Sequence, residues 1–168
     1  MFPHAFVPKT KILNPYKKFA EIKGKGNIEG FQVYHPKYLM FPRIFPIKNF
    51  LSFFLTLEGF LASNSSKKQI DKIMKDWNPD IIHMHSSLGE GLIGSRIKEK
   101  FHKPLVLTVH GEDITKHSKK LFSSSLTKHS IKSSDTIICV SKFLENEIRK
   151  LGIKNKNFQI IPMGGSTK

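Results

Sequence analysis

The sequence has very little cysteine and no long uninterrupted apolar run. Its single cysteine, Cys139, excludes an internal disulfide and fits a reducing compartment, so we expect a cytoplasmic protein. Cys139 also lies within an expected buried strand, where a thiol is a small apolar side chain rather than a nucleophile. A proline, a lysine and a glutamate interrupt the most apolar stretch, residues 44–62, so we expect no membrane-spanning helix. Two early prolines and the lack of a continuous apolar core argue against a secretory signal.

Acidic residues are also scarce. The chain has 13 Asp and Glu against 28 Lys and Arg, which gives a formal net charge of +15 over 168 residues. Such a charge attracts polyanions, namely nucleic acid, anionic lipid or phosphorylated substrates. The lysines are dispersed without an arginine-rich block, and most phenylalanines fall on apolar stripes rather than between basic residues. We therefore expect no nucleic acid as a partner, whereas peripheral contact with an anionic membrane stays open.

What the sequence does contain is a series of short apolar runs that are separated by helix-like segments. The runs lie at residues 81–82, 105–109, 136–140 and 158–161. Short runs rich in Ile, Val and Leu, with a helix and two loops between them, are typical of a parallel sheet with covered faces. The pattern predicts an α/β fold with a Rossmann-like, doubly wound parallel sheet. The intervening helices are expected at residues 88–101, 119–132 and 142–151, the last capped by Ser141 and stopped by Gly152.

The first part of the chain reads differently from the rest. Residues 1–46 are interrupted by prolines and glycines and predict an irregular segment with one strand at residues 31–34. Residues 47–164 are expected to form the Rossmann-like domain, and residues 165–168 a truncated interdomain linker. Within residues 47–63, phenylalanine and leucine recur at helical spacing, which predicts a helix with one apolar stripe. That stripe fits either core packing or a bilayer surface.

Small, polar and histidine residues follow each apolar run. In doubly wound sheets, ligands bind beyond the carboxyl ends of the strands, so these residues are the first candidates for a site. His110 ends the second run and is followed by Gly111, whose backbone permits a tight turn that projects an imidazole and two carboxylates into the cleft. The other candidates are Glu112 and Asp113 after the same run, Ser86, Ser87, Gly89 and Gly91 after the first run, Ser141 after the third, and Gly164 after the fourth.

Alternative interpretations apply to several of these positions. The glycines between Ser86 and Gly94 could help to hold a phosphate or a sugar hydroxyl at a helix N-terminus, or could serve tight packing. Their spacing matches neither GxGxxG nor a P-loop. His83 and His85 alternate on one strand and share a face, but no third ligand follows at a recognisable spacing, so we predict no metal site. A serine, histidine and aspartate triad at this edge lacks the Gly-x-Ser-x-Gly elbow, which argues against a hydrolase.

Four segments together carry a family resemblance. They are residues 78–85 (NPDIIHMH), 104–113 (PLVLTVHGED), 134–141 (SDTIICVS) and 160–164 (IIPMG). In this order and at these spacings they resemble the N-terminal domain of family 4 glycosyltransferases, which have the GT-B fold. Residues 28–39 also resemble a segment of some members that build envelope polysaccharides.

The resemblance implies transfer of a hexose from a nucleotide-sugar donor to a glycan or lipid-linked acceptor, usually with retention of configuration and without a metal or other cofactor. The acceptor would bind largely to this half. His110 would be the cleft histidine near the reaction centre, Gly111 would shape its turn, and Asp113 would accept a hydrogen bond from a hydroxyl. We therefore take His110 and Asp113 as catalytic candidates and the other positions, including Glu112, Ser141 and Gly164, as substrate-binding candidates.

Parts of the family pattern have no counterpart in this sequence. The first βαβ unit with its glycine-rich loop and the C-terminal domain that binds the nucleotide-sugar are both missing. We therefore expect the acceptor-binding N-terminal part of a glycosyltransferase, truncated at both ends, or one subunit that works with a separate C-terminal domain. The alternative is a non-catalytic module for sugars or lipids, or an inactive remnant, at a membrane surface.

Overall fold

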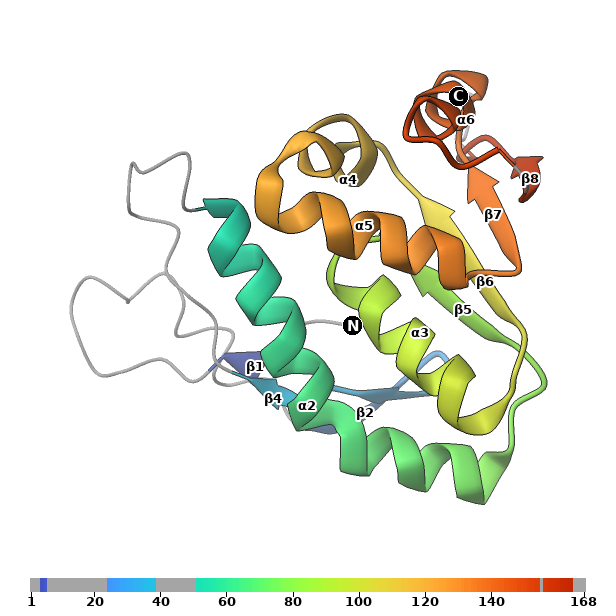
Figure 1. The fold of residues 1–168 in the computed structure, drawn as a ribbon. Coiled ribbons are helices and arrows are strands. Elements are labelled where there is room, and N and C mark those ends of the chain that lie inside the picture. Colours follow the sequence, from blue (N-terminus) through green and yellow to red (C-terminus); the bar gives the residue numbers. More distant parts are fainter. Residues whose placement is uncertain (1–3, 6–23, 39–50, 155, 165–168) are drawn as a thin grey trace, which may run out of the picture. The chain divides into compact units, whose positions relative to one another are not determined.

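Two compact units make up the chain, residues 1–77 and residues 78–168, and each is described by itself. The computed structural model describes residues 4–5, 24–38, 51–154 and 156–164 (Figure 1). The boundary that the sequence predicts between residues 46 and 47 lies outside these ranges and stays a prediction.

The first unit contains two small strand pairs. Strands β2 (Lys25–Ile28) and β3 (Phe31–Tyr34) form an antiparallel hairpin, and β3 covers the residues at which the sequence predicts a strand. Its two turn residues, Glu29 and Gly30, have φ angles of 50° and 86°, as a tight two-residue hairpin requires. Strands β1 (His4–Ala5) and β4 (Lys37–Tyr38) pair in parallel.

The first unit also contains the long helix α2 (Leu51–Trp77). The apolar stripe expected at residues 47–63 falls in part on this helix, where the side chains of Phe53 and Phe60 are 40% and 37% exposed. Within the described residues, no helix has both the length and the apolarity that a membrane span requires.

A four-stranded parallel sheet forms the centre of the second unit. Its order is β5 (Ile82–His85), β6 (Leu105–Val109), β7 (Thr136–Cys139) and β8 (Asn157–Ile160), so each strand pairs with the next one along the chain. Helices α3 (Gly89–Phe101), α5 (Leu121–Ser133) and α6 (Lys142–Lys150) connect successive strands. The predicted α/β fold with a Rossmann-like parallel sheet is confirmed.

Helices α3 and α5 pack side by side on one face of the sheet (Figure 1). The core below the helices joins fully buried side chains of neighbouring strands, such as Leu107 and Ile137, to Ile131 of α5 and Ile148 of α6. Burying one such side chain is worth about 1.5–3 kcal/mol. Cys139 lies in the same core, and burial raises the pKa of its thiol to about 11, so the thiol is protonated and inert at neutral pH.

Two glycines of α3 allow this close packing. A Cβ atom added at Gly94 would lie 2.4 Å from Met84 Cγ and 2.9 Å from Leu105 Cδ1, and one added at Gly91 would lie 2.7 Å from the side chain of Ser130. All three distances are shorter than van der Waals contact allows. The structure therefore gives these glycines a packing role between α3, the sheet and α5.

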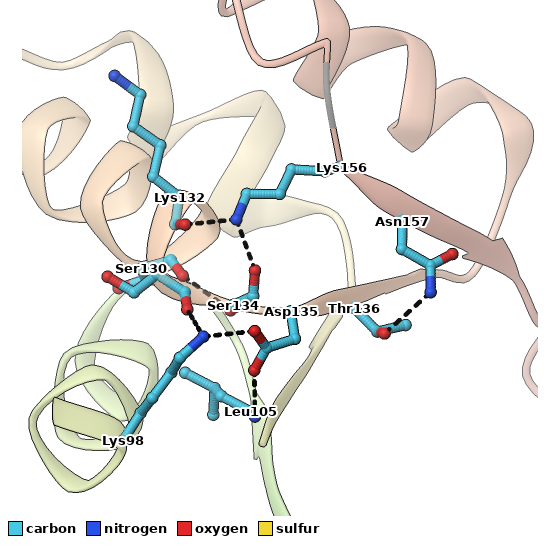
Figure 2. A network of polar contacts seen from close by, with 10 residues as sticks. Lys98, Leu105, Ser130, Lys132, Ser134, Asp135, Thr136, Lys156 and Asn157 are labelled. Atoms are coloured by element: carbon cyan, nitrogen blue, oxygen red, sulfur yellow. Dashed lines mark hydrogen bonds and ion pairs between the residues drawn. The ribbon is translucent and has the colours of Figure 1, made fainter. Parts of the chain in front are cut away.

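The amino ends of the strands are joined by a network of charged side chains (Figure 2). Lys98 Nζ donates to the backbone oxygen of Ser133 at 2.9 Å and to Asp135 Oδ1 at 2.5 Å, and Asp135 Oδ2 accepts from the backbone N–H of Leu105 at 2.8 Å. Lys156 Nζ donates to the backbone oxygens of Lys132 and Ser134. Carbonyl groups at the end of α5 thereby gain partners that the helix itself does not supply.

Candidate functional site at the carboxyl edge of the sheet

The carboxyl ends of β5 and β6 bring together the two segments that the sequence singles out. The strands pair with His85 opposite Thr108, so the chain leaves both strands at the same edge. Residues 86–87 follow β5, and residues 110–113 follow β6 and lead into the short helix α4 (Glu112–Thr115). A 3-10 turn at His117–Lys119 comes next, so α5 begins two residues later than the sequence predicts.

Asp113 joins these two segments. Its side chain is buried, with 6% of the residue exposed. Oδ2 accepts from the backbone N–H of Ser87 at 2.9 Å and from Ser87 Oγ at 3.2 Å, and Oδ1 accepts from the backbone N–H of Gly111 at 3.0 Å. Both carboxylate oxygens thus already have protein donors. The geometry supports a positioning role for Asp113, and acceptance of a substrate hydroxyl by this residue stays a prediction.

Both segments turn through backbone conformations that side chains disfavour. Ser86 has φ of 70°, its N–H donates to the backbone oxygen of Thr108 at 2.9 Å, and its own oxygen accepts from Gly91 N–H at 3.1 Å. Gly111 has φ of 138°, which L-residues rarely adopt. A non-glycine residue at positive φ costs about 1–3 kcal/mol, and such strain is common at functional sites.

Three histidine rings lie in a row beside these turns. The ring centroids of His83 and His85 are 4.6 Å apart, and those of His85 and His110 are 5.2 Å apart and nearly parallel. His85 Nδ1 and His110 Nε2 are hydrogen-bonded at 3.0 Å, whereas His83 Nε2 pairs with Thr108 Oγ1 at 2.8 Å. The shared face that the sequence predicts for His83 and His85 is therefore present, and the fold adds His110 to it.

Several ionisable groups around this edge have shifted pKa values. Partial burial lowers the pKa of His85, and the neighbouring His83 and His110 lower it further. Burial raises the pKa of Glu90 in the first turn of α3, against a backbone hydrogen bond that lowers it, and the charge of Asp113 adds to the rise. A charged Glu90 is thus disfavoured in the folded state.

Glu112 is less involved in this edge than the sequence suggests. It is exposed and forms an ion pair with Lys116 on the next turn. The hydrogen bond and the charge of Lys116 lower the pKa of Glu112. Its assignment to substrate binding stays a prediction.

The remaining predicted positions have separate places in the fold. Gly89 is the first residue of α3, and Gly91 faces Ser130 of α5. Ser141 caps α6, since its Oγ accepts from the backbone N–H of Leu144 at 3.4 Å. Gly164 follows β8, and a Cβ atom added there would meet no atom within 4 Å outside its chain neighbours. Substrate binding by these residues stays a prediction.

Two residues of this edge were missed as site residues by the sequence reasoning. His85 was considered only as a metal ligand, yet it is the hydrogen-bond partner of His110. Glu90 belongs to no motif, and its position at the start of α3 was the only signal in the sequence that could have identified it as a site residue. Among the described residues, no group of three or more His, Cys, Asp or Glu side chains is arranged to hold a metal ion.

Comparison with known proteins identifies the family of this chain. Over 77 residues, which are 46% of the chain and 22% of the relative, it is 34% identical to an uncharacterised glycosyltransferase of Methanocaldococcus jannaschii. It is 30% identical over 93 residues to a proposed teichuronic acid biosynthesis glycosyltransferase of Bacillus subtilis, and this match covers 54% of the chain and 23% of the relative. It is 34% identical over 92 residues to the N-acetyl-alpha-D-glucosaminyl L-malate synthase of Bacillus anthracis, a match that covers 50% of the chain and 23% of the relative.

The region matched in each relative is less than a quarter of that relative's length. The sequence model of glycosyltransferase family 4 matches residues 32–167, which is more than half of the chain and includes the whole carboxyl edge described above. The chain therefore belongs to glycosyltransferase family 4.

Proposed function

We propose that the chain forms the acceptor-binding part of an enzyme that transfers a hexosyl group from a nucleotide-sugar to a glycan or lipid-linked acceptor. Family membership supports the reaction class. The names of two relatives, for teichuronic acid biosynthesis and for an N-acetylglucosaminyl product, support a sugar or a hydroxyl-bearing molecule as the acceptor.

The observation that carries this proposal is the buried carboxylate of Asp113. By accepting hydrogen bonds from both Ser87 and Gly111, it holds the two turns in one arrangement. Beside them lie the exposed imidazole of His110 and the hydroxyl of Ser86. Sugar hydroxyls are bound by such donors and acceptors when these are fixed before the ligand arrives, because little entropy is then lost on binding.

Within this proposal, His110 contacts the reacting part of the substrates and Asp113 positions its loop. Gly111 is required because the turn between them needs a positive φ. We assign the nucleotide of the donor to a separate C-terminal domain, since the glycines after β5 do not have the spacing of a phosphate-binding loop.

The charge of the chain adds a location to the proposal. A net charge of +15 supports peripheral contact with the anionic cytoplasmic face of a membrane, where a lipid-linked acceptor resides. Co-sedimentation with phosphatidylglycerol vesicles at low salt, and its loss at high salt, is the expected result. Equal sedimentation with neutral phosphatidylcholine vesicles would contradict this placement.

Calorimetric titration tests the division of labour. The chain is titrated with UDP-glucose, UDP-N-acetylglucosamine and GDP-mannose, first alone and then mixed with the C-terminal domain of a family 4 enzyme. We expect no binding of the nucleotide-sugars by the chain alone, and sugar transfer to an added saccharide acceptor in the mixture. The variant His110→Ala should abolish transfer, whereas His129→Ala on α5 should leave it unchanged.

Each other result changes the proposal in a defined way. Binding of a nucleotide-sugar by the chain alone would place the donor site within this half. Binding of saccharides without transfer in any mixture would favour a non-catalytic binding module.

A further inference from the structure

The hydrogen bond between the imidazoles of His85 and His110 links the last residue of β5 to the first residue after β6. The two nitrogens are His85 Nδ1 and His110 Nε2, 3.0 Å apart. We propose that His85 is a positioning residue that holds His110 as its Nε2–H tautomer and leaves Nδ1 of His110 to accept a hydrogen bond from a substrate hydroxyl. The part of this inference that concerns a substrate hydroxyl rests on the proposed function, whereas the part that concerns the tautomer of His110 does not.

The parallel register explains why these two rings meet. His85 lies opposite Thr108, and His110 is two residues further along, so Thr108 and His110 extend to the same side as His83 and His85. His83 Nε2 pairs with Thr108 Oγ1 at 2.8 Å. His85 is thus the histidine of β5 that is bonded to His110, and His83 provides a natural control.

A hydrogen bond between two neutral imidazoles needs one proton between the two nitrogens, which leaves two arrangements. In the first, His110 Nε2–H donates to His85 Nδ1, and both rings are Nε2–H tautomers. In the second, His85 Nδ1–H donates to His110 Nε2, and both rings are Nδ1–H tautomers. A neutral histidine side chain intrinsically favours the Nε2–H tautomer. The first arrangement therefore combines the bond with the preferred form of both rings.

The surroundings of His85 support its role as the acceptor. Its pKa is lowered by partial burial and by the two neighbouring histidines, so it stays neutral and keeps the lone pair on Nδ1. The two rings are nearly parallel, with centroids 5.2 Å apart, so the bond runs between their edges, and rotation of His110 would break it. As in other sites where a second group orients a functional histidine, the bond on one ring nitrogen decides the chemistry of the other.

Side-chain nitrogen NMR of the whole chain, labelled with ¹⁵N-histidine, measures the tautomer directly. At about pH 8, above the ordinary histidine pKa of about 6.5, we expect His110 to be protonated at Nε2 and bare at Nδ1. We also expect a scalar coupling between His110 Nε2 and His85 Nδ1 across the hydrogen bond. A spectrum with His110 protonated at Nδ1 would overturn the proposal.

Three variants separate the hydrogen bond from the packing of the ring. His85→Phe keeps a ring of similar size without the nitrogen, so the coupling should vanish. The ratio of the Nε2–H to the Nδ1–H tautomer of His110 should fall severalfold, because the preference of His85 for its own Nε2–H form no longer adds to that of His110 through the bond. His85→Asn offers an oxygen near the place of Nδ1 and should restore the ratio. His83→Ala should leave both the ratio and the coupling unchanged.

The results of this experiment do not depend on any sugar. An unchanged His110 tautomer in His85→Phe would overturn the role of His85 even if the sugar transfer described above succeeds. The expected tautomer shifts would uphold that role even if no sugar is transferred, and the proposed function alone would then fail.

Discussion

At the amino ends of the strands in the parallel sheet, lysines donate hydrogen bonds to backbone carbonyls. At the carboxyl ends, the exposed imidazoles of His85 and His110 lie beside strained turns. Lys98 and Lys156 together reach three backbone oxygens near the end of α5, and Asp135 ties Lys98 to the first residue of β6. At the other edge, Ser86 and Gly111 have positive φ angles. The comparison teaches that one edge satisfies the backbone and contributes stability, while the other accepts strain to position side chains.

The buried carboxylate at the carboxyl edge offers the strongest way to break this comparison. Asp113→Ala removes the acceptor of two backbone N–H groups, those of Ser87 and Gly111. Each buried donor left without a partner costs about 1–3 kcal/mol, so we expect the free energy of unfolding to fall by about 3 kcal/mol. Urea denaturation measures it. Asp80→Ala, at an exposed aspartate, should change it by less than about 0.5 kcal/mol; equal losses in the two variants would show that Asp113 does not join the turns.

A side chain added in the strained turn after β6 should destabilise the fold more than one added after the end of β8. Gly111→Ala introduces a side chain at φ of 138°, and we expect a loss of about 2 kcal/mol in stability. The cause is backbone strain alone, since a Cβ at Gly111 meets no atom within 4 Å. Gly164→Ala is the matched control, because its Cβ also meets nothing within 4 Å. Thermal unfolding of both variants tests the difference, and a neutral Gly111→Ala would remove the argument from strain.

The amino edge is expected to respond more weakly and in a pH-dependent way. Lys98→Met keeps the aliphatic stem and removes the bonds to Ser133 and Asp135, so unfolding at pH 7 should become easier by about 1 kcal/mol. Burial raises the pKa of Asp135, but bonds from Leu105 N–H and Lys98 outweigh burial, and the pKa is lowered overall.

A lowered carboxyl pKa gives stability that is present above the unfolded pKa and is lost as the pH falls through the folded one. The difference between wild type and Lys98→Met should therefore hold at pH 5–7 and shrink only below about pH 4, given the ordinary pKa of 3.8. Urea denaturation at several pH values measures it. A difference that shrinks already near pH 6 would point to a histidine instead.

The smallest expected effect is a gain in stability at the carboxyl edge, on replacement of Glu90, and it sharpens the comparison of the two edges. The pKa of Glu90 is raised, so its contribution is favourable below the unfolded pKa and is lost as the pH rises through the folded one. Glu90→Gln should therefore stabilise the fold at pH 7 by about 0.5 kcal/mol and have no effect at about pH 3. Chemical denaturation at both pH values tests this. A loss of stability at pH 7 would mean that the charged form of Glu90 is favoured.

Much of the fold follows from local patterns in the sequence. The apolar runs at residues 105–109 and 136–140 predicted β6 and β7, and the helical spacing between them predicted α5. Ser141 was predicted as the cap of α6, and it accepts from Leu144 N–H. These features depend on interactions between residues a few positions apart, which a sequence displays directly. The short helix α4 was not predicted, because four residues carry too little periodicity.

The sequence by itself determined the order of the strands in the parallel sheet and of helices α3, α5 and α6, the family, and the two segments that contain His85 and His110. Only the tertiary structure decided what those segments do to each other. Ser87 lies 26 residues from Asp113 and His85 lies 25 residues from His110 along the chain, so these two contacts depend on the register of β5 against β6. The packing role of Gly91 was decided in the same way, since its neighbour Ser130 comes from another helix. Periodicity selects an element, but close packing between elements selects the contacts, and no local pattern encodes those.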